Sequence, residues 1–232
     1  ERLVRADNLV IALVGDVDPD AAAALVQRRF AELVGGSRVE ASLPPLEPAP
    51  RSVRNAIEHK DRAQAHLVIG FRGLDVHDPE RHALEVLCQI LSGQGGRLFL
   101  ELRDKQSLAY SVTAFDLEGV DPGIWGVYIA GEPAKLGEMQ SGIERELRRI
   151  VDGPIPDEEL ARAKAYLIGS QAVSLQRFGT QASLLSLDSL YGLGATFHLD
   201  YDDRIAAMTV DDVKRVAKRV VRLDAPVIAV VR

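Results

Sequence analysis

The stretch Ser92-Gly-Gln-Gly-Gly-Arg-Leu-Phe-Leu-Glu-Leu-Arg-Asp-Lys-Gln-Ser-Leu-Ala-Tyr-Ser-Val112 decides how the centre of this chain folds. Gly93, Gly95 and Gly96 permit backbone angles that residues with a Cβ avoid. The chain can therefore turn sharply at these glycines and enter a helix at Arg97.

A short amphipathic helix and then a strand are predicted after these glycines. The helix is expected over residues 95–104, with an apolar stripe formed by Leu98, Phe99 and Leu102. A polar break then leads into a strand over residues 107–118, on one face of which alternation places Leu108, Tyr110 and Val112. The helix end and the strand present Arg103 and Tyr110, seven residues apart. A guanidinium and a phenol held in this way could grip a peptide carbonyl.

The stretch resembles the second domain of the pitrilysin/insulinase family of zinc peptidases, which includes insulin-degrading enzyme and mitochondrial processing peptidase. In that family, a Gly-Gly-Arg-Leu-Phe-x-x-Leu-Arg-x-x-x-x-Leu-Ala-Tyr-like run binds substrate. The resemblance implies that Arg103 and Tyr110 are catalytic and substrate-binding residues, and that Gly95 and Gly96 also contact substrate.

The same resemblance implies a fold and a cofactor. The fold is α+β, with a mixed, largely antiparallel sheet covered by helices, as one of two tandem-duplicated domains. In such enzymes the first domain carries zinc on a His-x-x-Glu-His motif plus a distant Glu. The resemblance therefore implies a zinc-bearing partner domain or subunit, and no metal in this chain.

Composition is that of an ordinary globular protein, with 47% hydrophobic and 27% charged residues in 232, enough to form a core. The net charge of −6 argues against a nucleic-acid surface. The single Cys88 cannot form an internal disulfide, and we expect a buried, inert thiol. No apolar run is long enough to span a bilayer. We expect a soluble protein of the bacterial cytoplasm or periplasm, without a choice between the two.

Two similar apolar segments, Leu9–Val14 and Pro226–Val231, predict a fold duplicated in tandem. Each segment is typical of a buried strand that closes a domain. Residues 1–36 are therefore expected to be the closing strand and helix of a preceding domain. Residues 37–51 are expected to form a proline-rich linker, and residues 52–232 a complete C-terminal domain. The chain, which begins without Met, is expected to be a fragment of a longer protein.

Periodicity and turn signals predict the remaining elements. A helix is expected over residues 20–34, capped by Asp18 and begun by Pro19. The expected strands cover residues 9–14, 55–60, 65–73, 107–118, 123–131 and 226–231. The other expected helices cover residues 82–91, 134–151, 157–176, 181–191, 200–208 and 210–221.

Several patterns that suggest other chemistry fall short. His82-Ala-Leu-Glu85-Val86 comes close to the inverted zinc motif, but Val86 stands where the second His is required. No complete motif occurs among the five histidines: His59, His66, His77, His82 and His198. The glycine run lacks the Gly-Lys-Ser/Thr ending of a P-loop, and the chain has no Gly-x-Ser-x-Gly elbow. We predict that this chain alone holds no zinc and hydrolyses no peptide.

Two functions remain open. The first is that of the substrate-binding C-terminal half of a zinc-dependent metallopeptidase, facing a zinc domain that this chain does not contain. The alternative is a non-catalytic scaffold or partner subunit of the same family. The presence of both Arg103 and Tyr110 favours the first, because a structural role does not require them. The expected partners are a peptide or protein substrate, the zinc-bearing domain and a second copy of the chain.

Overall fold

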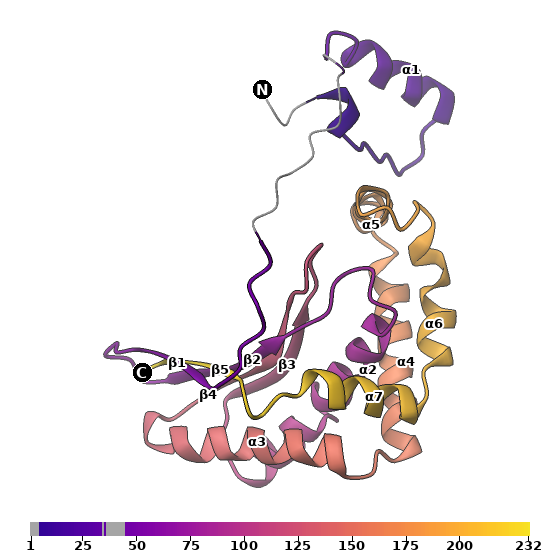
Figure 1. Ribbon diagram of the computed structural model, residues 1–232. Coiled ribbons are helices and arrows are strands. Elements are labelled where there is room, and N and C mark those ends of the chain that lie inside the picture. The colour runs from indigo at the N-terminus through magenta and orange to yellow at the C-terminus, as the bar shows by residue number, and fades with distance from the viewer. Residues whose placement is uncertain (1–4, 34, 36–44) are drawn as a thin grey trace. The chain divides into compact units, whose positions relative to one another are not determined.

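A five-stranded sheet with helices on one face forms the larger part of the protein (Figure 1). The structure is a computed structural model that describes residues 5–33, 35 and 45–232. The chain divides into two compact parts. One comprises residues 1–46 and 170–201, and the other comprises residues 47–169 and 202–232.

The strands of the larger part lie in the order β1-β5-β2-β4-β3. Their bounds are Arg54–Glu58 for β1, Ala65–Arg72 for β2, Ser111–Leu117 for β3, Ile124–Gly131 for β4 and Val227–Val231 for β5. Every neighbouring pair is antiparallel except β1 and β5, which are parallel. The predicted α+β fold with a mixed, largely antiparallel sheet is confirmed.

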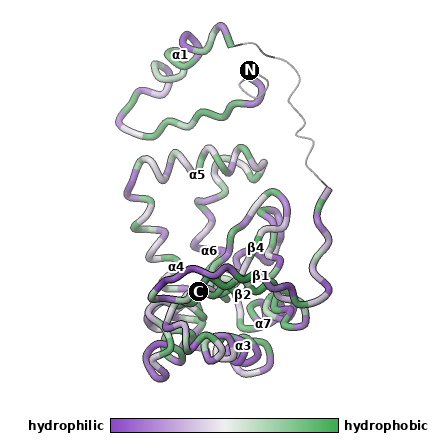
Figure 2. The backbone as a smooth tube through the Cα atoms, turned by 90° about the vertical axis from the view of Figure 1, so that its left-hand side faces the viewer, coloured by the Kyte–Doolittle hydropathy of each residue, from purple (hydrophilic) through white to green (hydrophobic). Residues whose placement is uncertain are grey.

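One face of the sheet carries the core. Leu67 and Ile69 of β2 are fully buried, and so are Val127 and Ile129 beside them on β4. Trp125 stacks on Phe71 with ring centroids 5.0 Å apart, and Figure 2 shows hydrophobic residues gathered along these strands. These closely packed side chains make the sheet a rigid support for the elements connected to it.

Helices α2 (Arg81–Leu91), α3 (Leu136–Asp152) and α7 (Val210–Val220) cover that face. The indole Nε1 of Trp125 donates to the Val220 carbonyl at 3.1 Å, which joins the core to the end of α7. The other elements of this part are a 3₁₀ turn η3 (Pro133–Lys135), a π-helix η2 (Phe99–Lys105), α6 (Tyr201–Ala207) and α4 (Asp157–Ser174), which begins here. Among the described residues, no helix is both long and apolar enough to cross a membrane.

The smaller part contains two described segments. The first has η1 (Ala6–Asn8) and α1 (Pro19–Arg29), and the second has α5 (Phe178–Leu190) and η4 (Phe197–Asp200). Asp18 caps α1 as predicted, because its side chain accepts from the Ala21 N–H at 2.7 Å. The helix ends at Arg29, five residues earlier than predicted. In the second segment, the imidazole of His198 lies 2.9 Å from Asp188, which also accepts from the His198 N–H.

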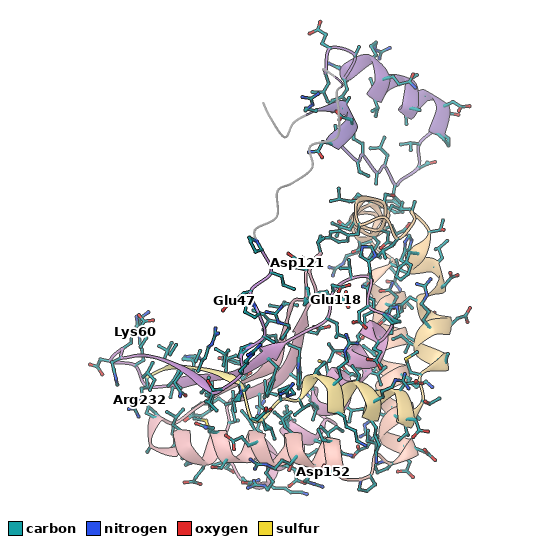
Figure 3. The ribbon with its side chains drawn as sticks, in the orientation of Figure 1. Glu47, Lys60, Glu118, Asp121, Asp152 and Arg232 are labelled. Atoms are coloured by element: carbon teal, nitrogen blue, oxygen red, sulfur yellow. The ribbon has the colours of Figure 1, made fainter. Side chains whose placement is uncertain are left out.

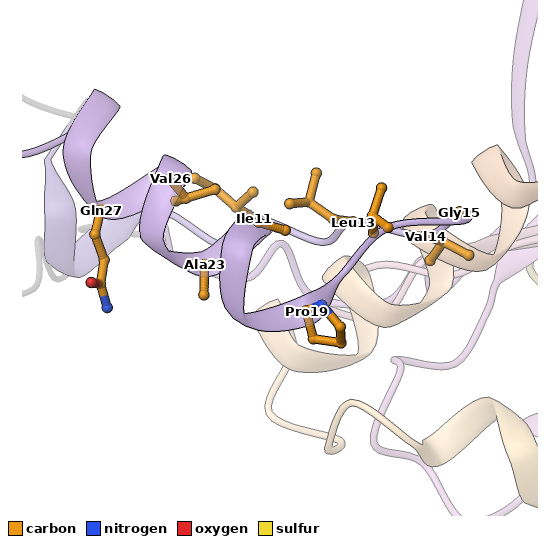
Figure 4. Close-up of a pocket in the computed structure, with 10 residues that line it drawn as sticks. Ile11, Leu13, Val14, Gly15, Pro19, Ala23, Val26 and Gln27 are labelled. Carbon is orange, nitrogen blue, oxygen red and sulfur yellow. The ribbon is translucent and has the colours of Figure 1, made fainter.

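The predicted strand over Leu9–Val14 is wrong. These residues are extended, but no described strand pairs with them, and strand structure requires hydrogen bonds to a neighbouring backbone. Their apolar side chains stay largely exposed, with Leu13 at 56%. Together with α1, of which no residue is buried, they line a hollow of about 590 Å³ (Figure 4). The sequence correctly indicated an apolar segment but not its neighbours.

Candidate functional site

The predicted glycine turn is present, and two of its glycines are required by its geometry. Gly93 has a φ of 76°, in the left-handed region that favours glycine. A Cβ on Gly96 would lie 2.0 Å from the carbonyl oxygen of Ser92, which is closer than any atom pair tolerates. The tight turn therefore brings the backbone of Gly96 directly against the end of α2.

Buried and half-buried side chains fix this turn to α4. Arg97 is only 8% exposed, and its guanidinium donates to Glu159 at 2.9 Å and to the Pro154 carbonyl at 2.8 Å. The carbonyl of Gly95 accepts from Arg162 at 3.1 Å. The turn and α4 enclose a groove of about 390 Å³. Removing Glu159 would leave the buried charge of Arg97 without its carboxylate partner.

The predicted helix after the turn is confirmed, but most of it, Phe99–Lys105, is a π-helix. Its buried Leu102 packs on α3, where a Cβ at Gly142 would lie 2.6 Å from a Leu102 methyl. Wide π turns are uncommon in proteins and are frequent at functional sites. The helix end that carries Arg103 is therefore held from beneath by a close helix–helix contact.

The predicted strand face containing Leu108, Tyr110 and Val112 is wrong. The strand β3 begins only at Ser111, and Ser107 before it has a φ of 51°. This left-handed residue reverses the chain after the π-helix, and the Leu108 N–H then donates to the Leu102 carbonyl at 2.8 Å. Leu108 and Val112 point into the core, whereas Tyr110 lies in a bend and is 55% exposed. The sequence pattern did not indicate this reversal, because a left-handed turn is usually marked by a glycine and position 107 is a serine.

Arg103 and Tyr110 are both exposed, from the end of η2 and the residue before β3. The Arg103 guanidinium lies 4.9 Å from the centroid of the Phe99 ring, which holds it by a cation–π contact. The Tyr110 N–H donates to the Ala130 carbonyl at 2.8 Å. Within the described part of the chain, no hydrogen bond or ion pair engages the Arg103 guanidinium or the Tyr110 hydroxyl. Both groups are available to a ligand.

The four predicted site residues do not converge at one point. Gly95 and Gly96 precede the helix that carries Arg103 near its other end, on the order of 10 Å along the axis. Gly95 instead lines the groove beside α4. The geometry gives the glycines a turn-forming role, and their contact with substrate stays a prediction.

The near-motif on α2 does not fit zinc. His82 is buried, its Nδ1 lies 3.5 Å from a Glu85 carboxylate oxygen, and Val86 is fully buried in the core. Among the described residues, no three His, Cys, Asp or Glu side chains gather closely enough to hold a metal ion. A core valine supplies packing where a ligand would be needed.

An acidic cluster lies between α2 and β3, and the sequence analysis did not find it. Arg81 binds the Glu118 carboxylate, with Nε 3.1 Å from Oε1. Burial, and then the charges of Glu118 and Glu85, raise the pKa of Asp116 to about 7. Within the described residues, Asp116 Oδ1 is buried without a hydrogen-bond partner. One signal in the sequence pointed to this cluster. Alternation along β3 places Asp116 on the side of the strand that faces the core, where aspartate is rare.

Two further features bear on the sequence analysis. Cys88 is buried as expected, and burial raises the pKa of its thiol, so it is unreactive. The role of Arg97 was missed because a single arginine after glycines gives no sign of burial.

Comparison with known proteins places the chain among zinc-protease relatives. The family described as "Peptidase M16 inactive domain" matches residues 1–167. An uncharacterized zinc protease of Streptomyces coelicolor is 31% identical over 222 residues, covering 92% of this chain and 48% of the relative. The uncharacterized zinc protease YmxG of Bacillus subtilis is 28% identical over 178 residues, covering 76% of this chain and 42% of the relative. The chain thus spans about half the length of the curated relatives it matches.

Solved structures agree on the fold. The peptidase M16 inactive domain of Pseudomonas fluorescens superposes with a TM-score of 0.85 at 25% identity, covering 98% of this chain and 54% of that one. A protease of Helicobacter pylori superposes with the same TM-score at 22% identity, covering 94% and 54%.

Gly96→Ala should destabilise the protein by about 2 kcal/mol or more, because its methyl group would overlap the Ser92 carbonyl. Gly95→Ala is the matched control, since its methyl group would meet only the flexible Arg162 side chain, 3.2 Å away. The control should cost about 1 kcal/mol or less. Urea unfolding monitored by circular dichroism measures both. Equal losses would show that the Ser92 contact is not the constraint.

Asp116→Asn should stabilise the protein increasingly as pH rises. The folded-state pKa of Asp116 is raised from the ordinary value of 3.8 to about 7. The folded state therefore holds an extra proton between these values, and the stability contributed by this group falls as pH rises through that window. The difference in Tm between variant and wild type should grow from about pH 5 to about pH 8. The exposed Asp104→Asn should show no such trend, and a constant difference for Asp116→Asn would contradict the assignment.

Purified 1–232 should contain no stoichiometric zinc, because His82 and Glu85 are two of the required ligands and Val86 cannot be a third. Elemental analysis after dialysis measures the zinc content. One zinc per chain that is lost in His82→Ala would overturn this prediction.

Proposed function

The chain belongs to the peptidase M16 family, the pitrilysin/insulinase family that its sequence resembles, and we propose that it is the substrate-binding C-terminal half of a zinc-dependent metallopeptidase. In this role it grips a peptide opposite a zinc-bearing domain or subunit that this chain does not contain. Several of its relatives are named zinc proteases, which supports a hydrolase as the parent protein.

The observation that carries the proposal is the contrast between a rigid frame and two exposed polar groups, the Arg103 guanidinium and the Tyr110 hydroxyl, which make no hydrogen bond or ion pair within the described part of the chain. The Arg97–Glu159 pair and the Leu102–Gly142 contact hold η2 in place. Arg103 and Tyr110 project from this frame into solvent. The frame fixes the backbone from which both side chains extend, and their exposure leaves them accessible to a ligand.

The two side chains differ in the hydrogen bonds that they offer to a peptide. Arg103 presents a permanently charged fork of N–H donors, and Tyr110 presents one neutral O–H donor. Both suit a carbonyl oxygen, and donors already in position stabilise the negative charge that this oxygen gains when the bond is attacked. Zinc held by the other half would supply the activated water and polarise the carbonyl.

A non-catalytic scaffold is the second candidate. The description of the matching family as inactive is compatible with a domain that only supports its partner. A scaffold has no need for Arg103 and Tyr110, so their substitution would then leave function unchanged.

We also place residues 1–36 in the preceding domain, residues 37–51 in a linker and residues 52–232 in the C-terminal domain. The exposed apolar surface of Leu9–Val14 and α1 supports this division, because such a surface is stable only when another element covers it. The chain's coverage of about half of its relatives agrees with it.

In the parent protein with its zinc-bearing half, Arg103→Ala and Tyr110→Phe should each lower kcat/KM for peptide hydrolysis by tens-fold or more. Losing one preorganised donor typically costs a few kcal/mol of transition-state stabilisation. Arg148→Ala is the matched control, an exposed arginine on α3 that pairs with Glu144. It should retain wild-type turnover.

Melting temperatures separate the two candidate functions. If the site binds substrate, both site variants keep a near-wild-type Tm while turnover falls. Unchanged turnover in both variants would refute the substrate-binding role and leave the scaffold.

A further inference from the structure

The two edges of the sheet are treated differently by the rest of the fold. At the β3 edge, the Ala114 N–H donates to Ser92 Oγ at 2.7 Å, and that hydroxyl lies 3.0 Å from the Ala114 carbonyl, to which it can donate. The end of α2 thus closes this edge against another strand. Natural sheets commonly protect an edge in this way, since its free backbone groups invite pairing.

The β1 edge has no such cover among the described residues. Every residue of β1 is exposed, and Ile57 is 56% exposed. The Arg54 N–H donates to the Pro226 carbonyl and the Glu58 carbonyl accepts from the Arg232 N–H, both at 3.0 Å. Because backbone groups alternate in direction along a strand, the N–H and C=O groups of Asn55 and Ile57 point away from β5, to the outside of the sheet.

These outward groups are complementary to a second copy of themselves. When two β1 strands run antiparallel about Ala56, Asn55 of one copy lies opposite Ile57 of the other. This pairing joins the outward N–H and C=O groups of both residues, as a hydrogen-bonded pair in an antiparallel ladder requires. Ala56 then faces its own counterpart on the two-fold axis, where a small side chain allows close approach.

The charges of β1 fit the same register. Two positions from the axis on either side, Arg54 of one copy lies opposite Glu58 of the other, and the symmetry repeats the pair. At present Arg54 contacts Glu47 at 2.8 Å and Glu58 contacts Lys60 at 3.0 Å, all on exposed side chains. Such exposed pairs contribute little stability and exchange readily. They therefore select the register more than they set the affinity.

We propose that β1 is a homodimerisation edge, on which two copies of this chain pair antiparallel about Ala56 into one continuous sheet. Pairing covers part of the exposed Ile57 side chain, which lies on the same face as the buried Ile228 and Val230 of β5. Lys60 and Arg232 mark the end of this edge in Figure 3. The short strand gives a small interface, so the dimer should be of modest affinity.

Ala56→Cys tests the register directly. Cysteines opposite each other at a non-hydrogen-bonded antiparallel pair are about 4.5 Å apart between Cα atoms, which lies within the range of a disulfide. Under mild oxidation this variant should form a covalent dimer. Leu117→Cys on the β3 edge is the matched control and should form no covalent dimer under the same conditions. The native Cys88 is buried and does not interfere.

A second set of variants tests the association itself by sedimentation velocity across a concentration series. Ile57→Pro removes an outward donor while leaving the β1–β5 ladder intact, so the dimer dissociation constant should rise about tenfold or more. Ile11→Pro is the control, another exposed isoleucine, in the segment before α1. It should dimerise like the wild type.

Charge variants keep the proposal testable if Ile57→Pro fails to fold. Arg54→Glu and Glu58→Arg should each weaken the dimer, and the double variant should restore it. A monomeric wild type, a dimer lost in Ile11→Pro but not in Ile57→Pro, or no disulfide in Ala56→Cys would overturn the proposal. None of these results depends on peptidase activity, so the failure of this proposal can be distinguished from the failure of the proposed function.

Discussion

The close approach of Gly96 to the carbonyl of Ser92 is the constraint on which the rest of the candidate site depends. Ser92 ends α2 and bonds to the backbone of β3, whereas Arg97, directly after the turn, is tied to Glu159 on α4. One turn of a few residues therefore connects two helices, a strand and the start of η2. Any side chain at Gly96 would separate these elements, because the atoms that its Cβ would meet belong to the backbone of Leu91 and Ser92 and cannot rotate away.

The helix α2 carries a sequence that comes close to a zinc motif and that packs into the core. Val86 fills the core where a metal ligand would be needed, and its neighbours His82 and Glu85 remain close together. The nearby Asp116 has a buried carboxylate oxygen, and burial, followed by the charges of two further carboxylates, raises its pKa. Such a concentration of negative charge reduces stability unless a proton or a cationic side chain offsets it, and Arg81 only partly does so.

The two proposed binding surfaces lie at opposite edges of the sheet. Ser92 closes the β3 edge beside the glycine turn, and the site residues Arg103 and Tyr110 project near the start of that strand. The β1 edge lies at the opposite end of the strand order, with three strands between it and β3. Pairing at β1 and ligand binding beside β3 therefore use separate backbone groups, and one need not exclude the other.

The sequence by itself determined most of the local structure. Period-two alternation and apolar runs indicated the five strands of the sheet, Asp18 and Pro19 indicated the start of α1, and the glycine run indicated the turn. These signals are local, because each depends on residues a few positions apart. Only the tertiary structure decided that Leu9–Val14 has no strand partner among the described residues and that Ser107 reverses the chain and exposes Tyr110. It also decided that Arg97 is buried and that one carboxylate oxygen of Asp116 is buried. Strand pairing and burial depend on residues far along the chain, so no local pattern could reveal them.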